Sequence, residues 1–442
     1  MIRGILTLFL GLAPALKGDV ALEAFLKSPS LRTASVGLCI VPLEGDEGMM
    51  EHHADLALIP ASTLKAVTTA TALQILGTEH RFVTRLLRDG DDVVVKGGGD
   101  PTLSMSSPEA EFPGWLAALK EAGMTEIKGD LVMDSSHFGS RVVPNSWPWG
   151  DVGNYYGSGA WGLSYHLNSY GVTFKPRKVG APAKLVGTYP KPPGVRFENF
   201  MRTGSPGSGD QGYAYGGPDA EVVSFRGTVP GGRSAFTIKG ALPNPPLSCG
   251  EGFKRYLLKE GFPVAGEVKI SIGKGEEIHR QEGPSLEKLV TATNHRSVNL
   301  YAEALMQDLG GLSVMKKHWA AQGVDLTGMV LHDGSGLSPR NSITPRQLAE
   351  ILKRAQEHET GALFEKSLPM AGRSGTLVSF GNGSAIAGRV RAKSGGMSRV
   401  KTYAGYLTKK SGKRYAFTLM TNNYVSSPKA AMVKFLSAQI SK

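Results

Sequence analysis

The spacing of apolar and polar residues changes several times along the chain, and each change predicts an element. Residues 34–42 (ASVGLCIVP) form an apolar, β-rich run. Residues 61–76 (ASTLKAVTTATALQIL) contain no Gly or Pro and carry Ala, Thr or Leu on nearly every side. This second run predicts a helix that is buried all round, with Pro60 at its start and Gly77 at its end.

The rest of the chain alternates between strand-like and helix-like stretches. The first half predicts short strands and few helices, at 82–87 (strand), 93–96 (strand), 113–122 (helix), 127–133 (strand), 253–260 (helix) and 268–272 (strand). Between 172 and 239 short β runs are divided by Pro/Gly clusters, which is typical of a small β domain. The second half predicts helices and then strands, with helices at 286–309, 314–322 and 345–357, strands at 390–393, 403–408 and 415–420, and a last helix from 428.

Length and composition indicate a folded protein with more than one core. A chain of 442 residues exceeds the size at which a single core stops growing. The formal net charge is +12, which favours anionic surroundings. The chain contains no dense Lys/Arg block and no basic helix with interleaved aromatic residues, so we expect no nucleic-acid partner. Two interpretations of this charge stay open: the protein works beside a polyanionic cell envelope, or its basic surface has no specific meaning.

The first 18 residues predict a secretory signal peptide. Arg3 precedes an uncharged stretch at 5–16, which ends near the small residues of Ala13-Pro14-Ala15. The stretch is shorter than the roughly 20 residues that span a bilayer, and no later apolar segment reaches that length, so we expect no stable membrane span. A buried N-terminal helix is the alternative interpretation.

Two cysteines, Cys39 and Cys249, are present. They could form one disulfide in an oxidising compartment, but the sequence does not decide whether they meet. Neither has a second Cys or a His at ligand spacing, so we expect no metal site and no cofactor.

A candidate nucleophile opens the buried helix at Ser62-Thr63-Leu64-Lys65. Residues three apart lie on one helix face, with Cβ atoms about 5–6 Å apart. A serine hydroxyl needs a base within reach, and a lysine amine can serve when burial lowers its pKa. The Ser-x-x-Lys spacing occurs six times in the chain and is weak by itself. Only the copy at Ser62 begins a helix too apolar to be a solvated surface.

Two further polar groups lie later in the chain. Ser297 and Asn299 are two residues apart, so their hydroxyl and amide can face one cleft; a polar helix N-cap is the alternative. Lys393-Ser394-Gly395-Gly396 places a cation beside glycines on a predicted strand, which would let a substrate backbone lie close and hold its carboxylate. Lys410-Ser411-Gly412 has a similar composition but fits a hairpin turn.

The ordered set Ser-x-x-Lys, Ser-x-Asn, Lys-Ser-Gly resembles the serine penicillin-binding enzymes and serine β-lactamases. The gap from Ser62 to Ser297 is more than twice the gap from Ser297 to Lys393. This layout is similar to that of the class C low-molecular-mass penicillin-binding proteins, the D-Ala-D-Ala carboxypeptidase/endopeptidase family. The same family is suggested by the stretches GGGDPTLS (97–104), IKGDLVMDSSHF (127–138), TNHRSVNLYAEAL (293–305), DGSGLSPRNSITP (333–345) and LPMAGRSGTL (368–377).

The resemblance implies an α/β (α+β) fold of the penicillin-binding/β-lactamase-like transpeptidase type. An antiparallel sheet flanked by helices would form the DD-peptidase domain from residues 19–80 and 275–442. Residues 81–171 with 241–274 would form one inserted α/β domain, and residues 172–240 a small β domain nested within it.

The resemblance also implies roles for the matching residues. Ser62 would attack the carbonyl of the penultimate D-Ala, and Lys65 would take its proton. Ser297, coupled to Lys393, would relay a proton to the leaving D-Ala, and Asn299 would bind the substrate amide. The backbone N–H groups of Ser62 and Gly396 would form the oxyanion hole, and Lys393 with Ser394 would hold the terminal carboxylate along the strand that includes Gly395 and Gly396.

Implied partners are peptidoglycan stem peptides and β-lactam antibiotics as covalent inhibitors, in the periplasm. Three positions depart from the common motif. Val298 stands where Asp or Asn is frequent, Ser394 replaces Thr and keeps the hydroxyl, and Gly396 lacks a hydroxyl. The alternatives are a β-lactamase or esterase on the same fold, and a catalytically inactive protein that binds the cell wall.

Overall fold

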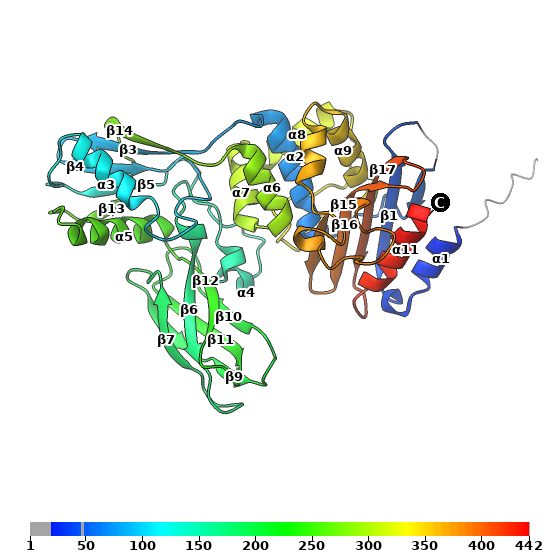
Figure 1. Cartoon of the computed structure of the whole chain (residues 1–442), viewed down its shortest axis with the longest axis horizontal. Helices are drawn as coiled ribbons and strands as arrows, with labels where there is room; N and C mark the ends of the chain where they lie inside the picture. The colour runs from blue at the N-terminus through cyan, green and yellow to red at the C-terminus, as the bar shows by residue number, and fades with distance from the viewer. Residues whose placement is uncertain (1–18, 46–47, 442) are drawn as a thin grey trace, which may run out of the picture.

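The computed structural model describes residues 19–45 and 48–441. The predicted signal peptide, residues 1–18, lies outside the described residues. The molecule is elongated, with a five-stranded sheet near one end, a group of helices beside it, and the remaining sheets at the other end and below (Figure 1). None of the helices in the described residues is long and apolar enough to cross a bilayer.

The five-stranded sheet is antiparallel, as predicted, and joins the two ends of the chain. Its order is β15-β16-β17-β1-β2. The strands are β1 (Ser35–Pro42), β2 (Met50–His52), β15 (Val390–Met397), β16 (Val400–Thr408) and β17 (Arg414–Asn422).

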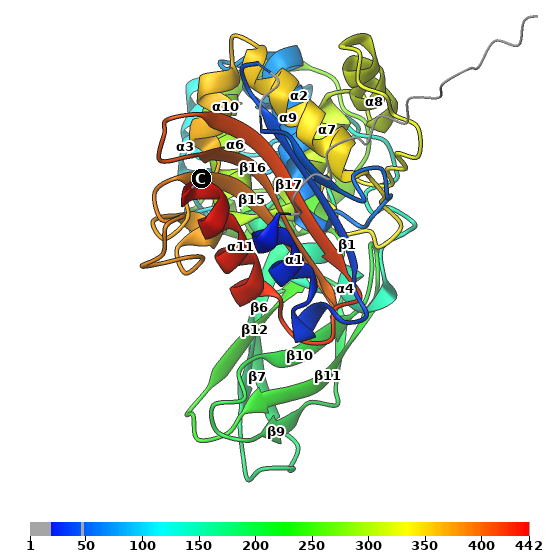
Figure 2. The same cartoon turned by 90° about the vertical axis from the view of Figure 1, so that its right-hand side faces the viewer.

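Both faces of this sheet are covered, which explains why β1 is buried at every position after Ser35. Leu38 and Ile40 point to one face, where they pack with α1 (Val20–Leu26) and α11 (Lys429–Ser441). Cys39 and Val41 point to the other, toward the main group of helices. Figure 2 shows α1 and α11 side by side across the outer face.

The main group of helices surrounds α2 (Leu64–Leu76), which follows a 3₁₀ turn at Ala61–Thr63. All residues of α2 from Leu64 to Leu73 are buried, and Gly77 follows at φ 80°. The predicted central helix is therefore confirmed. Its neighbours are α6 (Leu286–Arg296), α7 (Asn299–Asp308), α8 (Leu312–Ala321), α9 (Pro345–Glu357) and α10 (Gly361–Ser367).

The single helix predicted at 286–309 is wrong, because the chain breaks it into α6 and α7. Ser297 ends α6 in the left-handed region, with φ 57° and ψ 38°. An L-residue adopts this conformation only at a cost, so the break is held by surrounding contacts rather than by local preference.

The segment between α2 and α6 carries three further sheets. The larger has the order β13-β5-β4-β3-β14 and packs against α3 (Phe112–Glu121) and α5 (Pro245–Lys259). Its strands are β3 (Val83–Asp89), β4 (Asp92–Lys96), β5 (Leu131–Asp134), β13 (Val268–Ile270) and β14 (Glu276–Glu282). Helix α5 begins eight residues before the predicted start at 253, because Asn244 caps it by accepting a hydrogen bond from the Leu247 N–H.

The smaller sheets are built from the predicted β-rich stretch and hang below the others in Figure 1. One has the order β12-β6-β7, and the other pairs β11 with β10, β8 and β9. Their bounds are β6 (Ser169–Lys175), β7 (Lys184–Tyr189), β8 (Arg196–Asn199), β9 (Arg202–Gly204), β10 (Gln211–Tyr215), β11 (Val222–Pro230) and β12 (Phe236–Ala241). The division of the chain into one main and two inserted domains stays a prediction.

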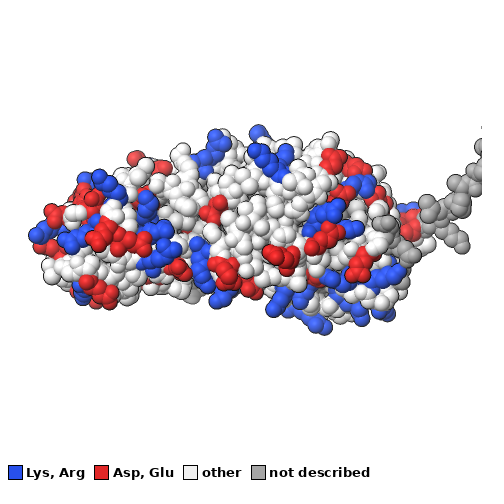
Figure 3. All heavy atoms as spheres, turned by 90° about the horizontal axis from the view of Figure 1, so that it is seen from above, with Lys and Arg blue, Asp and Glu red and all other residues white. Residues whose placement is uncertain are grey.

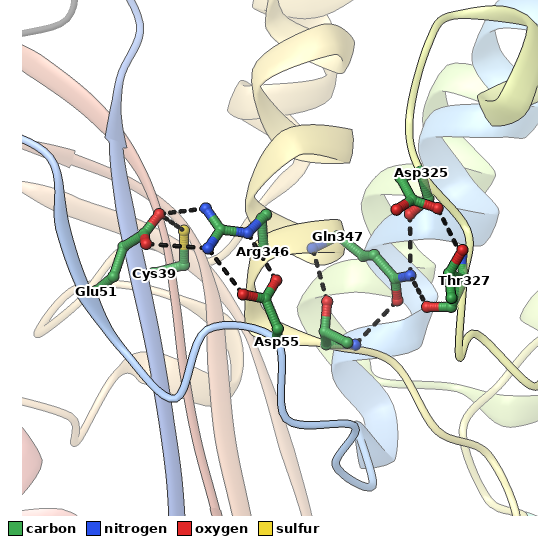
Figure 4. A network of polar contacts seen from close by, with 8 residues as sticks. Cys39, Glu51, Asp55, Asp325, Thr327, Arg346 and Gln347 are labelled. Carbon is green, nitrogen blue, oxygen red and sulfur yellow. Dashed lines mark hydrogen bonds and ion pairs between the residues drawn. The ribbon is translucent and has the colours of Figure 1, made fainter.

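A cluster of ion pairs fastens the edge strand β2 to helix α9 (Figure 4). The Arg346 guanidinium donates to Asp55 at 2.7 and 2.9 Å and to both oxygens of Glu51. Gln347 caps the same helix by a reciprocal pair of hydrogen bonds with Thr344. These contacts fix α9 against the five-stranded sheet.

The two cysteines do not pair. Both are buried as free thiols. Cys39 lies in the core of the five-stranded sheet and its helices, and Cys249 lies in the core of the segment between α2 and α6, called the inserted region below. Burial and the nearby Glu51 carboxylate raise the pKa of the Cys39 thiol to about 12, so it stays protonated and unreactive at neutral pH.

Charged side chains of both signs are interspersed on the face seen in Figure 3, and the middle of that face carries few of them. The net positive charge of the chain is therefore not concentrated on that face as a single basic patch.

Candidate active site

The start of α2 places Ser62 and Lys65 next to each other. The Nζ of Lys65 lies 3.0 Å from the Oγ of Ser62. Ser62 is partly exposed, whereas the Lys65 side chain is fully buried. Ala61, just before the serine, is left-handed at φ 47°, and a Cβ on Gly336 would lie 1.9 Å from its carbonyl oxygen. Ser62 thus follows a strained turn against which a neighbouring loop is tightly packed.

Lys65 makes two further hydrogen bonds to oxygen atoms from distant parts of the chain. It donates to the Asn299 side-chain oxygen at 2.6 Å and to the Ser335 carbonyl at 2.7 Å. A neutral amine has two N–H groups and one lone pair. With both N–H groups given to these acceptors, the lone pair faces the Ser62 hydroxyl, which is the arrangement that a general base requires.

Burial also favours the neutral form of the amine. It lowers the pKa of Lys65 to about 8, although the carboxylates of Asp333 and Glu303 act in the opposite direction. Lys65 can therefore accept a proton near neutral pH, which an exposed lysine does not do.

Lys393 and Ser297 form a second amine–hydroxyl pair. The Nζ of Lys393, on β15, lies 2.9 Å from the Oγ of Ser297. Lys393 is fully buried, and burial together with the positive charge of Lys65 holds its pKa well below the ordinary value. The left-handed conformation of Ser297 turns its hydroxyl toward this amine, so the break between α6 and α7 serves the site.

Asn299, the first residue of α7, connects the site to the inserted region. Its carbonyl oxygen accepts from Lys65, and its amide donates to the backbone oxygen of Tyr156 at 2.8 Å. The side chain is therefore held at both ends. The sequence pattern alone gave no sign that the inserted region would reach the active site.

Strand β15 runs beside Ser62, and Gly395 makes this possible. A Cβ on Gly395 would lie 2.2 Å from Thr402 Oγ1, 2.7 Å from the Pro60 carbonyl and 3.0 Å from the Ser62 backbone nitrogen. Only glycine allows the strand to pass this close. On either side of Gly395, Ser394 is partly exposed and Gly396 is exposed.

The structure therefore brings together every predicted site residue. Lys65 bonds to Ser62 and Asn299, and Lys393 bonds to Ser297. Gly395, two residues after Lys393 and between Ser394 and Gly396, brings this strand against Ser62. The roles assigned to these residues stay predictions.

Three residues that sequence reasoning did not single out support the base. The Ser335 carbonyl contacts Lys65, and the Glu303 carboxyl group accepts the N–H groups of Gly334 and Ser335, at 3.1 and 2.7 Å. Burial and the charge of Asp333 raise the pKa of Glu303 to about 8. Glu303 lies one helical turn after Asn299, on the same face of α7. An acidic residue on that otherwise apolar face is the sequence feature that could have identified it.

Asp333 organises the loop that carries Ser335. Its carboxylate accepts hydrogen bonds from Trp147 Nε1, the backbone nitrogens of Gly336 and Ser338, and Asn341 Nδ2, at 2.6 to 2.8 Å. Asp333 is fully buried. The loop and its lysine contact therefore depend on one carboxylate.

Replacing Asp333 by Ala should destabilise the protein by about 3 kcal/mol or more, because several buried donors lose their acceptor at about 1–3 kcal/mol each. Urea denaturation of the variant against wild type measures the change. The control is Asp91→Ala, which removes a carboxylate from an exposed position. An Asp333→Ala effect no larger than that of the control would contradict the role of Asp333.

The rate of acylation should rise with pH up to about 8 and then level off. Only the neutral amine of Lys65 accepts a proton, and with a pKa of about 8 roughly one molecule in ten is neutral at pH 7. Single-turnover acylation by a chromogenic β-lactam between pH 6 and 9 measures this profile, with circular dichroism as the check that the fold is unchanged. A flat profile over this range would exclude the titration of a buried base.

Comparisons with known proteins agree with this geometry. Residues 19–439 match the D-Ala-D-Ala carboxypeptidase 3 (S13) family. The chain is 27% identical to a D-alanyl-D-alanine carboxypeptidase of Actinomadura sp. (strain R39), over 91% of this chain and 80% of that protein. It is 24% identical to the D-alanyl-D-alanine carboxypeptidase DacB of Haemophilus influenzae, over 88% of this chain and 86% of that protein.

The fold is shared with solved structures. The crystal structure of penicillin binding protein 4 (dacB) from Haemophilus influenzae superposes with a TM-score of 0.83 at 22% identity, covering 95% of this chain and 98% of that one. This confirms the predicted penicillin-binding type of fold. The chain belongs to the D-Ala-D-Ala carboxypeptidase 3 (S13) family and is a serine-type D-Ala-D-Ala carboxypeptidase.

Proposed function

We propose that the protein removes the terminal D-Ala from peptidoglycan stem peptides through an acyl-enzyme on Ser62. The 3.0 Å contact between the Ser62 hydroxyl and the buried amine of Lys65 is the observation that carries this proposal. Lys65 takes the hydroxyl proton while Ser62 Oγ forms a bond to the carbonyl carbon of the penultimate D-Ala.

The next step breaks the peptide bond. The tetrahedral oxyanion would be held by the backbone N–H groups of Ser62 and Gly396, and loss of one such donor typically lowers a rate by about 10²–10³. The leaving D-Ala nitrogen receives a proton from Ser297, and the proton that Lys65 took from Ser62 restores the Ser297 hydroxyl through Lys393. The 2.9 Å contact between the two supports this relay.

Lys65, neutral again, then takes a proton from the water that attacks the ester and gives it to Ser62 Oγ as the ester bond breaks. Asn299 binds the amide of the acyl part of the substrate, and Ser394 binds the carboxylate of the leaving D-Ala. Asn299 contacts the Lys65 amine, and Ser394 lies on the strand that passes beside Ser62. These placements support the two binding roles.

The same chemistry extends to D-Ala-meso-diaminopimelate cross-links. In such a cross-link the attacked carbonyl again belongs to D-Ala, and the leaving group again carries a carboxylate next to its nitrogen. A peptidoglycan endopeptidase from Bdellovibrio bacteriovorus shares the fold, with a TM-score of 0.51 at 16% identity. We therefore include endopeptidase action in the proposal.

Penicillin and related β-lactams would acylate Ser62 covalently. The penicillin binding protein 4 from Haemophilus influenzae has also been solved in complex with a β-lactam, and that structure superposes with a TM-score of 0.79. The predicted signal peptide at 1–18 supports export to the periplasm, where the wall substrate lies.

Incubation with a purified stem pentapeptide and with cross-linked muropeptide dimers tests the proposal. We expect free D-Ala from the first and monomers from the second, both abolished by prior treatment with penicillin. No product from either substrate would favour an inactive wall-binding protein. Rapid turnover of penicillin without release of D-Ala would favour a β-lactamase.

A further inference from the structure

Strand β15 has no side chain at Gly396, where a second side chain beside Ser394 could bind the substrate carboxylate. In β15, Ser394 and Gly396 are two residues apart, so their Cβ positions face the same side of the sheet. Their cross-strand partners on β16 are Tyr403 and Lys401. Side chains of directly paired residues lie on one face, so Lys401 is placed beside the missing side chain of Gly396.

The Lys401 amine fills the space over Gly396. Its Nζ lies 3.5 Å from the point where a Cβ on Gly396 would stand, and its Cδ lies 3.8 Å from that point. The Nζ also lies 5.5 Å from the centre of the Tyr403 ring. The lysine therefore leans along the strand toward Ser394 and the open edge of the sheet.

Lys401 has no negative partner in the part of the chain that the structure describes. No carboxylate forms an ion pair with it, although the side chain is partly buried. Burial and the positive charge of Lys429 hold its pKa below the ordinary value. A partly buried cation without a counter-charge gains stability when an anion binds beside it.

Thr376 provides a second hydroxyl at the same place. Its Oγ1 lies 2.8 Å from the Oγ of Ser394, and its side chain is exposed. The short helix Gly375–Leu377 that carries it is pressed against α6, where a Cβ on Gly375 would lie 2.9 Å from the His295 carbonyl. The hydroxyls of Ser394 and Thr376 and the Lys401 amine thus lie on the same side of β15.

We propose that Lys401 and Thr376 act with Ser394 to bind the C-terminal α-carboxylate of the substrate. The proposal deepens the proposed function and rests on it. The ammonium of Lys401 supplies the charge at the position where Gly396 has no hydroxyl. The paired hydroxyls of Ser394 and Thr376 supply two O–H donors that rotate toward the carboxylate oxygens.

Two substrates that differ only in this group provide the test. An acyl-D-Ala-D-Ala peptide with a free carboxylate is compared with the same peptide ending in a carboxamide, and the ratio of their kcat/KM values is measured. A charge-assisted hydrogen bond contributes about 1.5–3 kcal/mol, so Lys401→Met should lower this ratio by about 10- to 100-fold, mainly through KM. Lys401→Arg should restore part of it, and Thr376→Val should lower it by about tenfold.

The matched control is Lys410→Met, which removes an exposed lysine from the turn after β16 and should leave the ratio at the wild-type value. Equal losses on both substrates in Lys401→Met would mean a structural role and would overturn the proposal. An unchanged ratio would overturn it too. Failure of the wild type to release D-Ala from either peptide would instead contradict the proposed function, so the two failures are distinguishable.

Discussion

Replacing Ser62 by Ala is expected to lower the release of D-Ala by about 10⁶-fold, the size of effect seen when a serine peptidase loses its nucleophile. Lys65 then has no hydroxyl to deprotonate, and no acyl-enzyme forms. The Ser62 hydroxyl is partly exposed and contacts only the Lys65 amine among the hydrogen bonds described for its side chain, so the fold should be retained. Release of D-Ala from a stem pentapeptide, measured over long incubations, gives the residual rate.

The chain offers a matched control in Ser313→Ala. Ser313 and Lys316 repeat the Ser-x-x-Lys spacing, but Ser313 is exposed at the start of α8. This variant should retain wild-type activity. Activity within tenfold of wild type in Ser62→Ala would show that the nucleophile is another residue.

Replacing Lys65 by Met should lower the rate of acylation by up to about 10⁴-fold, because a positioned general base contributes about 10²–10⁴. Met has a similar length and no charge, but it leaves the Asn299 and Ser335 oxygens without their donor, so we also expect a loss of stability of about 1–3 kcal/mol per unpaired oxygen. The loss of acylation should persist under conditions in which the variant is still fully folded. Stopped-flow acylation by a chromogenic β-lactam, paired with urea denaturation, separates the two.

Lys65→Arg distinguishes a base from a positive charge. Arginine keeps the charge but does not lose its proton in proteins, so this variant should be as slow as Lys65→Met. Lys316→Met, at the partly exposed copy of the motif, should acylate at the wild-type rate. Full activity in Lys65→Arg would contradict proton transfer to this residue.

The elements whose apolar pattern is local could be predicted from the sequence. The central helix, β1 and β17 were predicted close to their observed bounds, because each has an almost continuous apolar run. Strands β15 and β16 were predicted too short, since β15 continues through the polar and glycine residues up to Met397 and β16 begins at Val400. The ordered motifs of Ser62, Ser297 and Lys393 predicted one shared cleft through the family that they resemble.

The features that depend on contacts between distant segments could not be predicted. The break at Ser297 follows no Gly or Pro and is held by the tertiary environment. The contact between Lys65 and the Ser335 carbonyl joins residues that are 270 positions apart, with the whole segment between α2 and α6 between them. No local pattern reports such a pairing.

The inserted region also contributes directly to the site, which its sequence did not indicate. Trp147 donates to the buried Asp333, and the Tyr156 carbonyl holds Asn299. Both contacts are single polar groups in loops, where apolar periodicity carries no information about partners.

The attachment point of penicillin tests most directly whether Ser62 is the nucleophile of this cleft. The wild-type protein is treated with penicillin, digested with trypsin and examined by tandem mass spectrometry. We expect one added penicillin mass on the peptide 33–65, with fragment ions that place it on Ser62 rather than on Ser35. An adduct on any other residue, or no adduct at saturating penicillin, would contradict the assignment.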